Sequence, residues 1–208
     1  IRDVERSRGL GDVYKRQATK HEDAIYFSKR VTRAVPDGGP IEAHTDLVKK
    51  LDYECELAVV LGRDARDVPA GQTRDYIFGY TILNDVSARD VQTAHKQWYF
   101  GKSLGGFTPI GPCIVTADAF ADYPPRLGIR SFVNGEKRQD SNTALQIFDI
   151  DHVIAELSQG MTLKAGTIIA TGTPAGVGMG MDPPQFLKPG DVVRCEIEGI
   201  GTLTNPVK

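Results

Sequence analysis

The segment from Leu51 to Leu61 most constrains the fold, because it places two acidic residues in an otherwise apolar run typical of a buried β-strand. Successive strand side chains point to opposite faces, so Glu54 and Glu56 should share one face. An unpaired carboxylate is costly in a protein interior, and two neighbouring carboxylates repel each other. A divalent cation with oxygen ligands would relieve both problems, given one more acid from elsewhere in the chain. The alternative is a strand whose polar face meets solvent or an arginine.

The composition is that of a globular protein with one core. A chain of 208 residues with 40% hydrophobic and 25% charged residues can bury a single well-formed core. The net charge of -2 gives no electrostatic reason to expect nucleic acid or an anionic membrane as a partner. No apolar run approaches the roughly 20 residues that span a bilayer, and none begins the chain as a secretory signal would. We therefore expect a cytoplasmic protein with neither kind of partner.

The cysteines indicate a reducing compartment. Cys55, Cys113 and Cys195 lie in apolar, strand-like contexts, and the chain has no Cys-X-X-Cys pair that would indicate zinc or redox chemistry. We expect three buried free thiols.

The beginning of the chain differs from the rest. Residues 1–17 have scattered charge and no sustained helical or strand period, and their second half resembles translated sequencing-adapter read-through. We expect residues 1–17 to be a non-native segment or a disordered terminus, and residues 18–208 to form a single domain.

Hydrophobic patterning predicts many short strands and few helices. Strands are expected over residues 24–28, 51–61, 113–116, 127–133, 136–141, 167–171 and 191–199, with a short helical turn passing into another strand over 75–84 and a closing hairpin after 199. Helices are expected over 87–96, with Ser87 in a shortened capping box, and over 150–158, capped by Asp149 or Asp151. The segments 36–40, 101–112 and 171–178 are rich in glycine or proline and predict loops. With 22 glycines and 12 prolines, the pattern predicts a β-dominated α+β domain and not a doubly wound parallel sheet.

Further polar residues are placed to meet the two glutamates. Asp85 ends an apolar strand, and Arg89 and Gln92 follow at four and seven residues, which a helix brings onto one face. Lys102 lies in one glycine-rich segment, and 171–178 forms another directly after a strand. These are the components of a metal site with a pocket for an anion.

Five motifs in this order resemble the fumarylacetoacetate hydrolase family. They are Tyr53-Glu-Cys-Glu-Leu57, Asn84-Asp-Val-Ser-Ala-Arg-Asp-Val-Gln92, Gly101-Lys-Ser103, Thr171-Gly-Thr-Pro-Ala-Gly-Val-Gly178 and Lys188-Pro-Gly-Asp-Val-Val193. The resemblance runs from about Ala24 to the carboxyl end. It implies a mixed β-roll with a few short helices, a catalytic domain over 18–208, a homodimer, and Mg²⁺ or Mn²⁺ as the cofactor, with Ca²⁺ left open.

The resemblance also assigns residues to roles. The implied metal ligands are Glu54, Glu56 and Asp85. The residues implied to bind the substrate carboxylate and carbonyl oxygens are Arg89, Gln92, Lys102 and Thr173, of which the first three are also the implied catalytic residues. Their alternatives are an exposed helix face for Arg89 and Gln92, a solvated loop lysine for Lys102, and a plain connection for the loop 171–178.

The expected substrate is a small anionic 2-oxo acid. Breaking a carbon–carbon bond next to a carbonyl is feasible when the leaving carbanion is an enolate, and a 2-oxo acid can bind a divalent ion through its carboxylate and 2-oxo oxygens, so that the metal acts as template and Lewis acid. We expect Lys102 to stabilise developing oxyanion charge, with the Thr173 hydroxyl and loop N–H groups as fixed donors.

Three functions are compatible with this chemistry. The first is a metal-dependent hydrolase that cleaves a carbon–carbon bond in acylpyruvate-type 1,3-dicarbonyl (2,4-dioxo) acids. The second is a lyase, decarboxylase or isomerase that uses the same metal site on a related 2-oxo acid. The third is an inactive homologue that only binds metal and a dicarboxylate such as oxalate.

The water-activating base of a hydrolase is not evident in the sequence. Hydrolytic members of the family generally use a histidine and a glutamate on a segment before the first core strand. His21 and Glu22 are adjacent, so in an extended segment they point apart, and they lie too close to the following strand. We expect His44, His95 and His152 to be surface or helix histidines.

Overall fold

The computed structural model of the protein describes residues 23–208. The predictions for residues 1–17, and for His21 and Glu22, lie outside the described residues. No helix between residues 23 and 208 is both long and apolar enough to cross a membrane.

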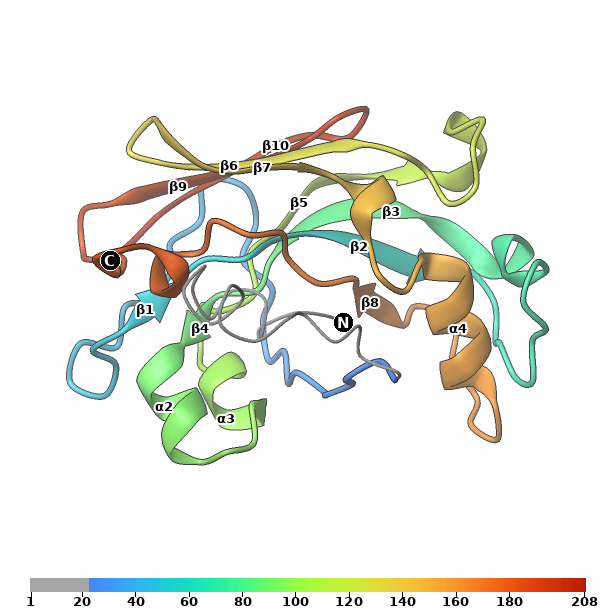
Figure 1. Ribbon diagram of the computed structural model, residues 1–208, viewed down its shortest axis with the longest axis horizontal. Coiled ribbons are helices and arrows are strands. Elements are labelled where there is room, and N and C mark those ends of the chain that lie inside the picture. The colour runs from blue at the N-terminus through green and yellow to red at the C-terminus, as the bar shows by residue number, and fades with distance from the viewer. Residues whose placement is uncertain (1–22) are drawn as a thin grey trace.

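Two four-stranded antiparallel sheets form the body of the described chain (Figure 1). The first, in the order β5-β3-β2-β8, contains β2 (Cys55–Leu61), β3 (Ile77–Asn84), β5 (Ile110–Thr116) and β8 (Ile168–Ala170). The second, in the order β10-β9-β6-β7, contains β6 (Gly128–Val133), β7 (Glu136–Asn142), β9 (Val192–Ile197) and β10 (Gly201–Pro206). A small two-stranded pair joins β1 (Leu51–Asp52) to β4 (Ser87–Ala88). The prediction of a β-dominated α+β fold is confirmed.

The core lies between the two sheets. On β9 every second residue is buried, so Val193, Cys195 and Ile197 face inward while their neighbours reach the surface. Strand β2 differs, because all seven of its residues are buried. Both of its faces are therefore covered, which explains its nearly continuous apolar sequence and places any acid on it inside the protein.

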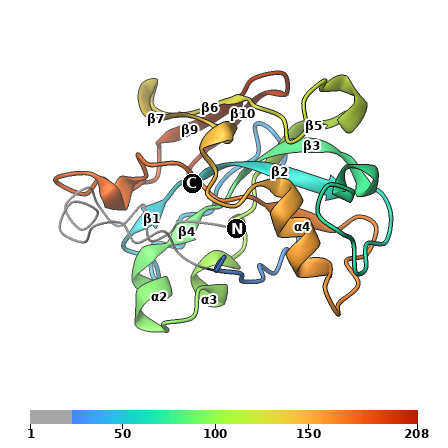
Figure 2. The same cartoon turned by 45° about the vertical axis from the view of Figure 1, so that its right-hand side comes forward.

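Three α-helices and four 3-10 turns complete the described structure. The helices are α2 (Arg89–Ala94), α3 (Tyr99–Lys102) and α4 (Ile150–Ser158), and the turns are η1 (Thr73–Tyr76), η2 (Ala117–Ala119), η3 (Thr143–Leu145) and η4 (Gly178–Gly180). Helix α4 has the predicted bounds, and the Asp149 side chain accepts a hydrogen bond from the backbone N–H of His152 at 2.8 Å. In Figure 2, α4 lies beside one end of β2, and α2 and α3 lie below β1 and β4.

Several predicted boundaries are wrong for local reasons. Residues 24–28 form no strand, and side chains hold this segment instead: the Tyr26 hydroxyl donates to Glu156 and Lys29 contacts Asp85. The strand predicted over 51–61 is interrupted at residues 53–54, where the Glu54 N–H donates to the side chain of Asn84 and not to a backbone carbonyl.

The predicted helix 87–96 begins two residues late, because Ser87 and Ala88 pair with β1. Ser87 does not cap the helix, since its hydroxyl donates to the carbonyl of Asp85 at 2.8 Å. The predicted loop 101–112 is shorter than expected, because α3 extends to Lys102 and β5 begins at Ile110.

The cysteine prediction is only partly correct. All three thiols are free, and Cys55 and Cys195 are buried, but Cys113 is exposed. Cys113 lies on β5, which is an edge strand of the first sheet and has no buried residue.

Candidate active site

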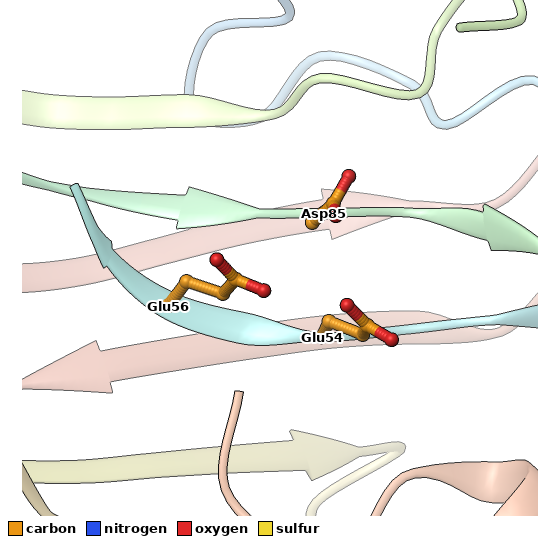
Figure 3. Close-up of side chains that lie close together, drawn as sticks. All are labelled: Glu54, Glu56 and Asp85. Atoms are coloured by element: carbon orange, nitrogen blue, oxygen red, sulfur yellow. The ribbon is translucent and has the colours of Figure 1, made fainter. Parts of the chain in front are cut away.

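Three carboxylates meet where β2 and β3 are paired. Cys55, between the two glutamates, lies opposite Asn84, and the backbone N–H of Asp85 donates to the carbonyl of Glu54 at 2.8 Å. The carboxylates of Glu54, Glu56 and Asp85 each offer an oxygen within 4.8 Å of the others, and all three residues are buried. Figure 3 shows both glutamate side chains projecting from the β2 segment toward the chain that carries Asp85. The spacing of the two glutamates along one segment and the pairing of that segment with β3 are thus sufficient to bring the three acids together.

Two lysines bind the same carboxylate. Lys102 Nζ lies 2.6 Å from Asp85 Oδ2 and 2.7 Å from Glu54 Oε2, and Lys29 Nζ lies 2.6 Å from Asp85 Oδ1. Lys29 also donates to the backbone carbonyl of Phe107. Burial alone would raise the pKa of Asp85, but Lys102 and Lys29 hold that pKa down at about 2. Asp85 is therefore ionised at neutral pH.

Glu56 is in a less favourable electrostatic position. Among the described residues it forms no ion pair, and its carboxylate accepts a hydrogen bond from the backbone N–H of Gly172 at 2.8 Å. Burial raises the pKa of Glu56 most, and the neighbouring Asp85 and Glu54 carboxylates raise it further. Together these effects bring the pKa to about 8. Added positive charge at this position would be stabilising.

The donor set fits a divalent metal ion. Mg²⁺ and Mn²⁺ prefer carboxylate oxygens, and three buried acids whose oxygens converge would provide three such ligands. The raised pKa of Glu56 reflects the repulsion that a divalent ion would remove. Glu54, Glu56 and Asp85 are the described residues that could hold the ion.

The structure places Arg89 and Gln92 beside the acid cluster. Arg89 Nη1 lies 2.6 Å from Glu54 Oε1, and Arg89 Nε donates to Asp52 Oδ2 at 2.9 Å. Gln92 follows one helical turn later on α2, and its side-chain oxygen accepts from Arg89 Nη1 at 3.3 Å. Both side chains are buried, and within the described chain Arg89 Nη2 and Gln92 Nε2 have no hydrogen-bond partner. Both nitrogens are themselves buried, and neither residue is in the wall of the cavity that opens from the cluster.

Thr173 lies apart from this group. Its hydroxyl donates to the carbonyl of Cys55 at 3.0 Å and accepts from Gln139 Nε2 at 2.7 Å. It lines a second cavity, of about 250 Å³, together with Thr171 and Gly172. The loop nevertheless reaches the cluster through its backbone, because Gly172 binds Glu56.

A cavity of about 610 Å³ opens from the acid cluster. Glu54, Glu56, Asp85 and Lys29 form part of its wall, and most of the remainder is apolar. Its size is typical of a site for a small organic molecule. His44, His95 and His152 lie elsewhere in the described structure: His44 contacts the Gly105 carbonyl, His95 follows α2, and His152 is exposed on α4.

The sequence analysis missed two residues of the cluster. Asp52 is completely buried and accepts backbone N–H groups from Gly178 at 2.7 Å and Met179 at 3.0 Å, in addition to binding Arg89. Its position two residues before Glu54 continues the same alternation, so the pattern Asp-X-Glu-X-Glu could have indicated it. Lys29 had no such signal, because it reaches Asp85 from 56 residues away through an irregular segment.

The buried cluster as a whole is nearly balanced in charge. It contains four carboxylates and three cations: Asp52, Glu54, Glu56, Asp85, Lys29, Lys102 and Arg89. With all four acids ionised, as they would be around a metal ion, one net negative charge remains, and a bound divalent ion would make the cluster positive. An anionic ligand would then be attracted to the cavity.

Comparisons with known proteins identify the family of the chain. A family model described as "Fumarylacetoacetate (FAA) hydrolase C-terminal" matches residues 4–208. Oxaloacetate tautomerase YisK of Bacillus subtilis is 44% identical over 186 residues, covering 89% of this chain and 62% of YisK. The chain spans about three fifths of the length of the first curated relatives that it matches.

Two solved structures show the same architecture. The fumarylacetoacetate hydrolase EaFAH of Exiguobacterium antarcticum has 47% identity and a TM-score of 0.88, covering 94% of this chain and 70% of the EaFAH chain. A 2-hydroxyhepta-2,4-diene-1,7-dioate isomerase of Mycobacterium marinum has 43% identity and a TM-score of 0.79, covering 90% of this chain and 69% of the isomerase chain. The five motifs, the fold and the extent of these matches lead to one conclusion: the chain belongs to the fumarylacetoacetate hydrolase family.

Proposed function

We propose that the protein is a divalent-metal-dependent enzyme that converts a small 2-oxo acid by way of its enolate, with keto–enol tautomerisation or isomerisation as the net reaction. The observation that carries the proposal is the buried carboxylate cluster with two lysines on one acid, at one end of a cavity of about 610 Å³. In this proposal Glu54, Glu56 and Asp85 hold Mg²⁺ or Mn²⁺. When bound, the ion would act as a Lewis acid on the 2-oxo group and would orient the acid.

The residues around the cluster have separate tasks. Lys102 Nζ, between Glu54 and Asp85, is placed to stabilise negative charge that develops on the 2-oxo oxygen. In this proposal Arg89 and Gln92 bind the substrate carboxylate through the buried nitrogens that lack partners in the described chain, which requires the two side chains to turn toward the cavity. Lys29 Nζ lies in the cavity wall and can donate a hydrogen bond to the substrate or exchange a proton with it.

Two relatives support tautomerisation over cleavage. YisK is named as an oxaloacetate tautomerase, and the Mycobacterium marinum protein as an isomerase of a hydroxydienedioate. Both names describe movement of a proton next to a 2-oxo or 2-hydroxy group without loss of a carbon fragment.

The second candidate is hydrolysis of an acylpyruvate, the reaction expected from the sequence resemblance. The similarity to EaFAH, which is named as a fumarylacetoacetate hydrolase, favours it. Hydrolysis uses the same enolate, and it also requires an attacking water and a base. The third hypothesis, a protein that only binds metal and dicarboxylate, requires the same cluster without turnover.

Three assays on one preparation separate these functions. With saturating Mg²⁺, ultraviolet absorbance should show faster keto–enol interconversion of oxaloacetate than in the matched Glu56→Ala variant. Pyruvate release from an acylpyruvate would establish the hydrolase instead, and CO₂ release from oxaloacetate a decarboxylase. Metal-dependent oxalate binding with no turnover in any assay would leave the binding protein as the remaining function. A homodimer, also implied by the family resemblance, is tested by light scattering during size-exclusion chromatography.

A further inference from the structure

The cavity beside the acid cluster is charged at one end only. Its charged wall residues, Glu54, Glu56, Asp85 and Lys29, all belong to the cluster. The other described wall residues are uncharged, and large aliphatic side chains are frequent among them. This asymmetry determines what the far end of a ligand can carry.

Strand register gives the direction of the cavity. Ala58 of β2 lies opposite Ala170 of β8, and Val60 lies opposite Ile168. Paired residues share a face with each other and with every second residue along the strand, so Ala170 and Ile168 continue the face that carries Glu56. All three line the cavity. At a rise of about 3.3 Å per residue, Ile168 lies about 13 Å along the strand from the level of Glu56.

The walls along this path are apolar. Leu83 lies opposite Glu56, and Ile110 lies opposite Leu83, so the apolar surface begins beside the acids. At the far end, Leu157 of α4 and Leu163 line the cavity together with Ile168. Ile168 is 49% exposed, although it lies on a cavity wall between apolar neighbours. A ligand with an apolar tail would cover this surface.

We propose that the site selects 2-oxo monocarboxylic acids with an uncharged aliphatic substituent, and selects against long 2-oxo dicarboxylic acids. The inference rests on the proposed function, which places the 2-oxo acid group at the cluster. A second carboxylate at the far end would lose water and meet no cation among the described wall residues, and that loss is costly. An aliphatic tail would instead leave water and pack on the leucine and isoleucine side chains. Oxaloacetate is too short to test this, because its second carboxylate stays near the cluster.

The test uses titration calorimetry at saturating Mg²⁺ to compare ligands that differ in the length of the tail or in the charge at its end. 2-Oxooctanoate should bind at least about tenfold more tightly than 2-oxobutanoate, since each buried methylene contributes about a threefold to fourfold gain. It should also bind at least about tenfold more tightly than 2-oxooctanedioate, which has the same number of carbons. Oxalate, which has no tail, serves as the reference for binding at the cluster.

A charge placed at the far end should reverse the preference. Ile168→Lys should favour 2-oxooctanedioate over 2-oxooctanoate and leave oxalate affinity unchanged. The matched control is Phe78→Lys, which replaces an apolar residue of similar exposure that is not part of this cavity. This control should keep the wild-type order of affinities.

The outcomes separate the inference from the proposed function. Metal-dependent binding of oxalate with no gain from the tail, or tighter binding of the diacid to the wild type, overturns the inference and leaves the proposed function intact. Failure of oxalate and of every 2-oxo acid to bind overturns both. The wild-type comparison alone decides the question if Ile168→Lys does not fold.

Discussion

Arg89 Nε donates to Asp52 Oδ2 at 2.9 Å, with both side chains almost completely buried. The same arginine contacts Glu54, so Asp52 holds one of the cations that balance the acid cluster. Asp52 also accepts the backbone N–H groups of Gly178 and Met179. One carboxylate therefore ties α2, β1 and the loop after β8 to the site.

Asp52→Ala should strongly destabilise the fold. Removing one partner of a buried ion pair leaves the other charge uncompensated, which typically costs about 3–5 kcal/mol. Denaturant unfolding should show this as a lower midpoint. The matched control is Asp64→Ala, which removes an exposed acid paired with Lys164 and should change the midpoint little. Equal effects of the two substitutions would contradict the role given to Asp52.

Mg²⁺ or Mn²⁺ should raise the melting temperature, and EDTA should lower it. A ligand that binds only the folded state stabilises it, and here the positive ion would also offset the repulsion among three carboxylates. Glu56→Ala should abolish the metal-induced shift. Glu136→Ala, which removes an exposed glutamate on β7, should retain it. A full metal response in Glu56→Ala would show that the ion binds elsewhere.

The metal-free protein should lose stability as the pH rises from about 4.5 to about 8. Burial and the two neighbouring acids raise the pKa of Glu56 from 4.5 to about 8, so in this range the folded state binds a proton more tightly than the unfolded state. Glu56→Gln should remove this part of the slope and stabilise the metal-free protein most above pH 8. Melting temperatures of both proteins in EDTA between pH 5 and 9 give the comparison. Parallel curves would contradict the environment described for Glu56.

Lys102→Met should separate ligand binding from metal binding. It removes the ammonium that contacts Glu54 and Asp85, so the metal-free protein should unfold at a lower temperature. Metal affinity should not fall, because a competing cation has been removed, whereas oxalate should bind more weakly and turnover should drop. Lys164→Met on the surface is the control. Unchanged oxalate binding in metal-loaded Lys102→Met would remove this lysine from the mechanism.

Local sequence patterns were sufficient for three of the four acids in the cluster and for most elements. The alternation in residues 51–61 and the acid at the end of the next strand predicted the cluster. These two strands are consecutive in the sequence and pair with each other as antiparallel neighbours in the sheet. The two strands predicted over 127–133 and 136–141, which pair as a hairpin, and the helix predicted over 150–158 depend on equally local signals, and these elements formed as predicted to within a residue.

The remaining features depend on contacts that no local pattern encodes. Ser87 carries a capping signal, but its backbone pairs with β1, so the helix begins only at Arg89. Lys102 was expected in a loop, because its flanking glycines obscured the short α3. Lys29 approaches Asp85 along an irregular segment, and its partner is determined only when the sheet and that segment pack together.

The backbone hydrogen bond from Asp85 to Glu54 has a consequence for ion selectivity. It fixes two of the three acids relative to each other through the sheet, while the Gly172 N–H restrains the third. Ca²⁺ requires longer metal–oxygen distances, of about 2.3–2.6 Å, than the 2.0–2.1 Å of Mg²⁺. With the backbones held in this way, only rotation of the acidic side chains could widen the donor set for the larger ion, and for Glu56 that rotation would lengthen the hydrogen bond from the Gly172 N–H. The strand pairing would therefore favour the shorter distances of Mg²⁺.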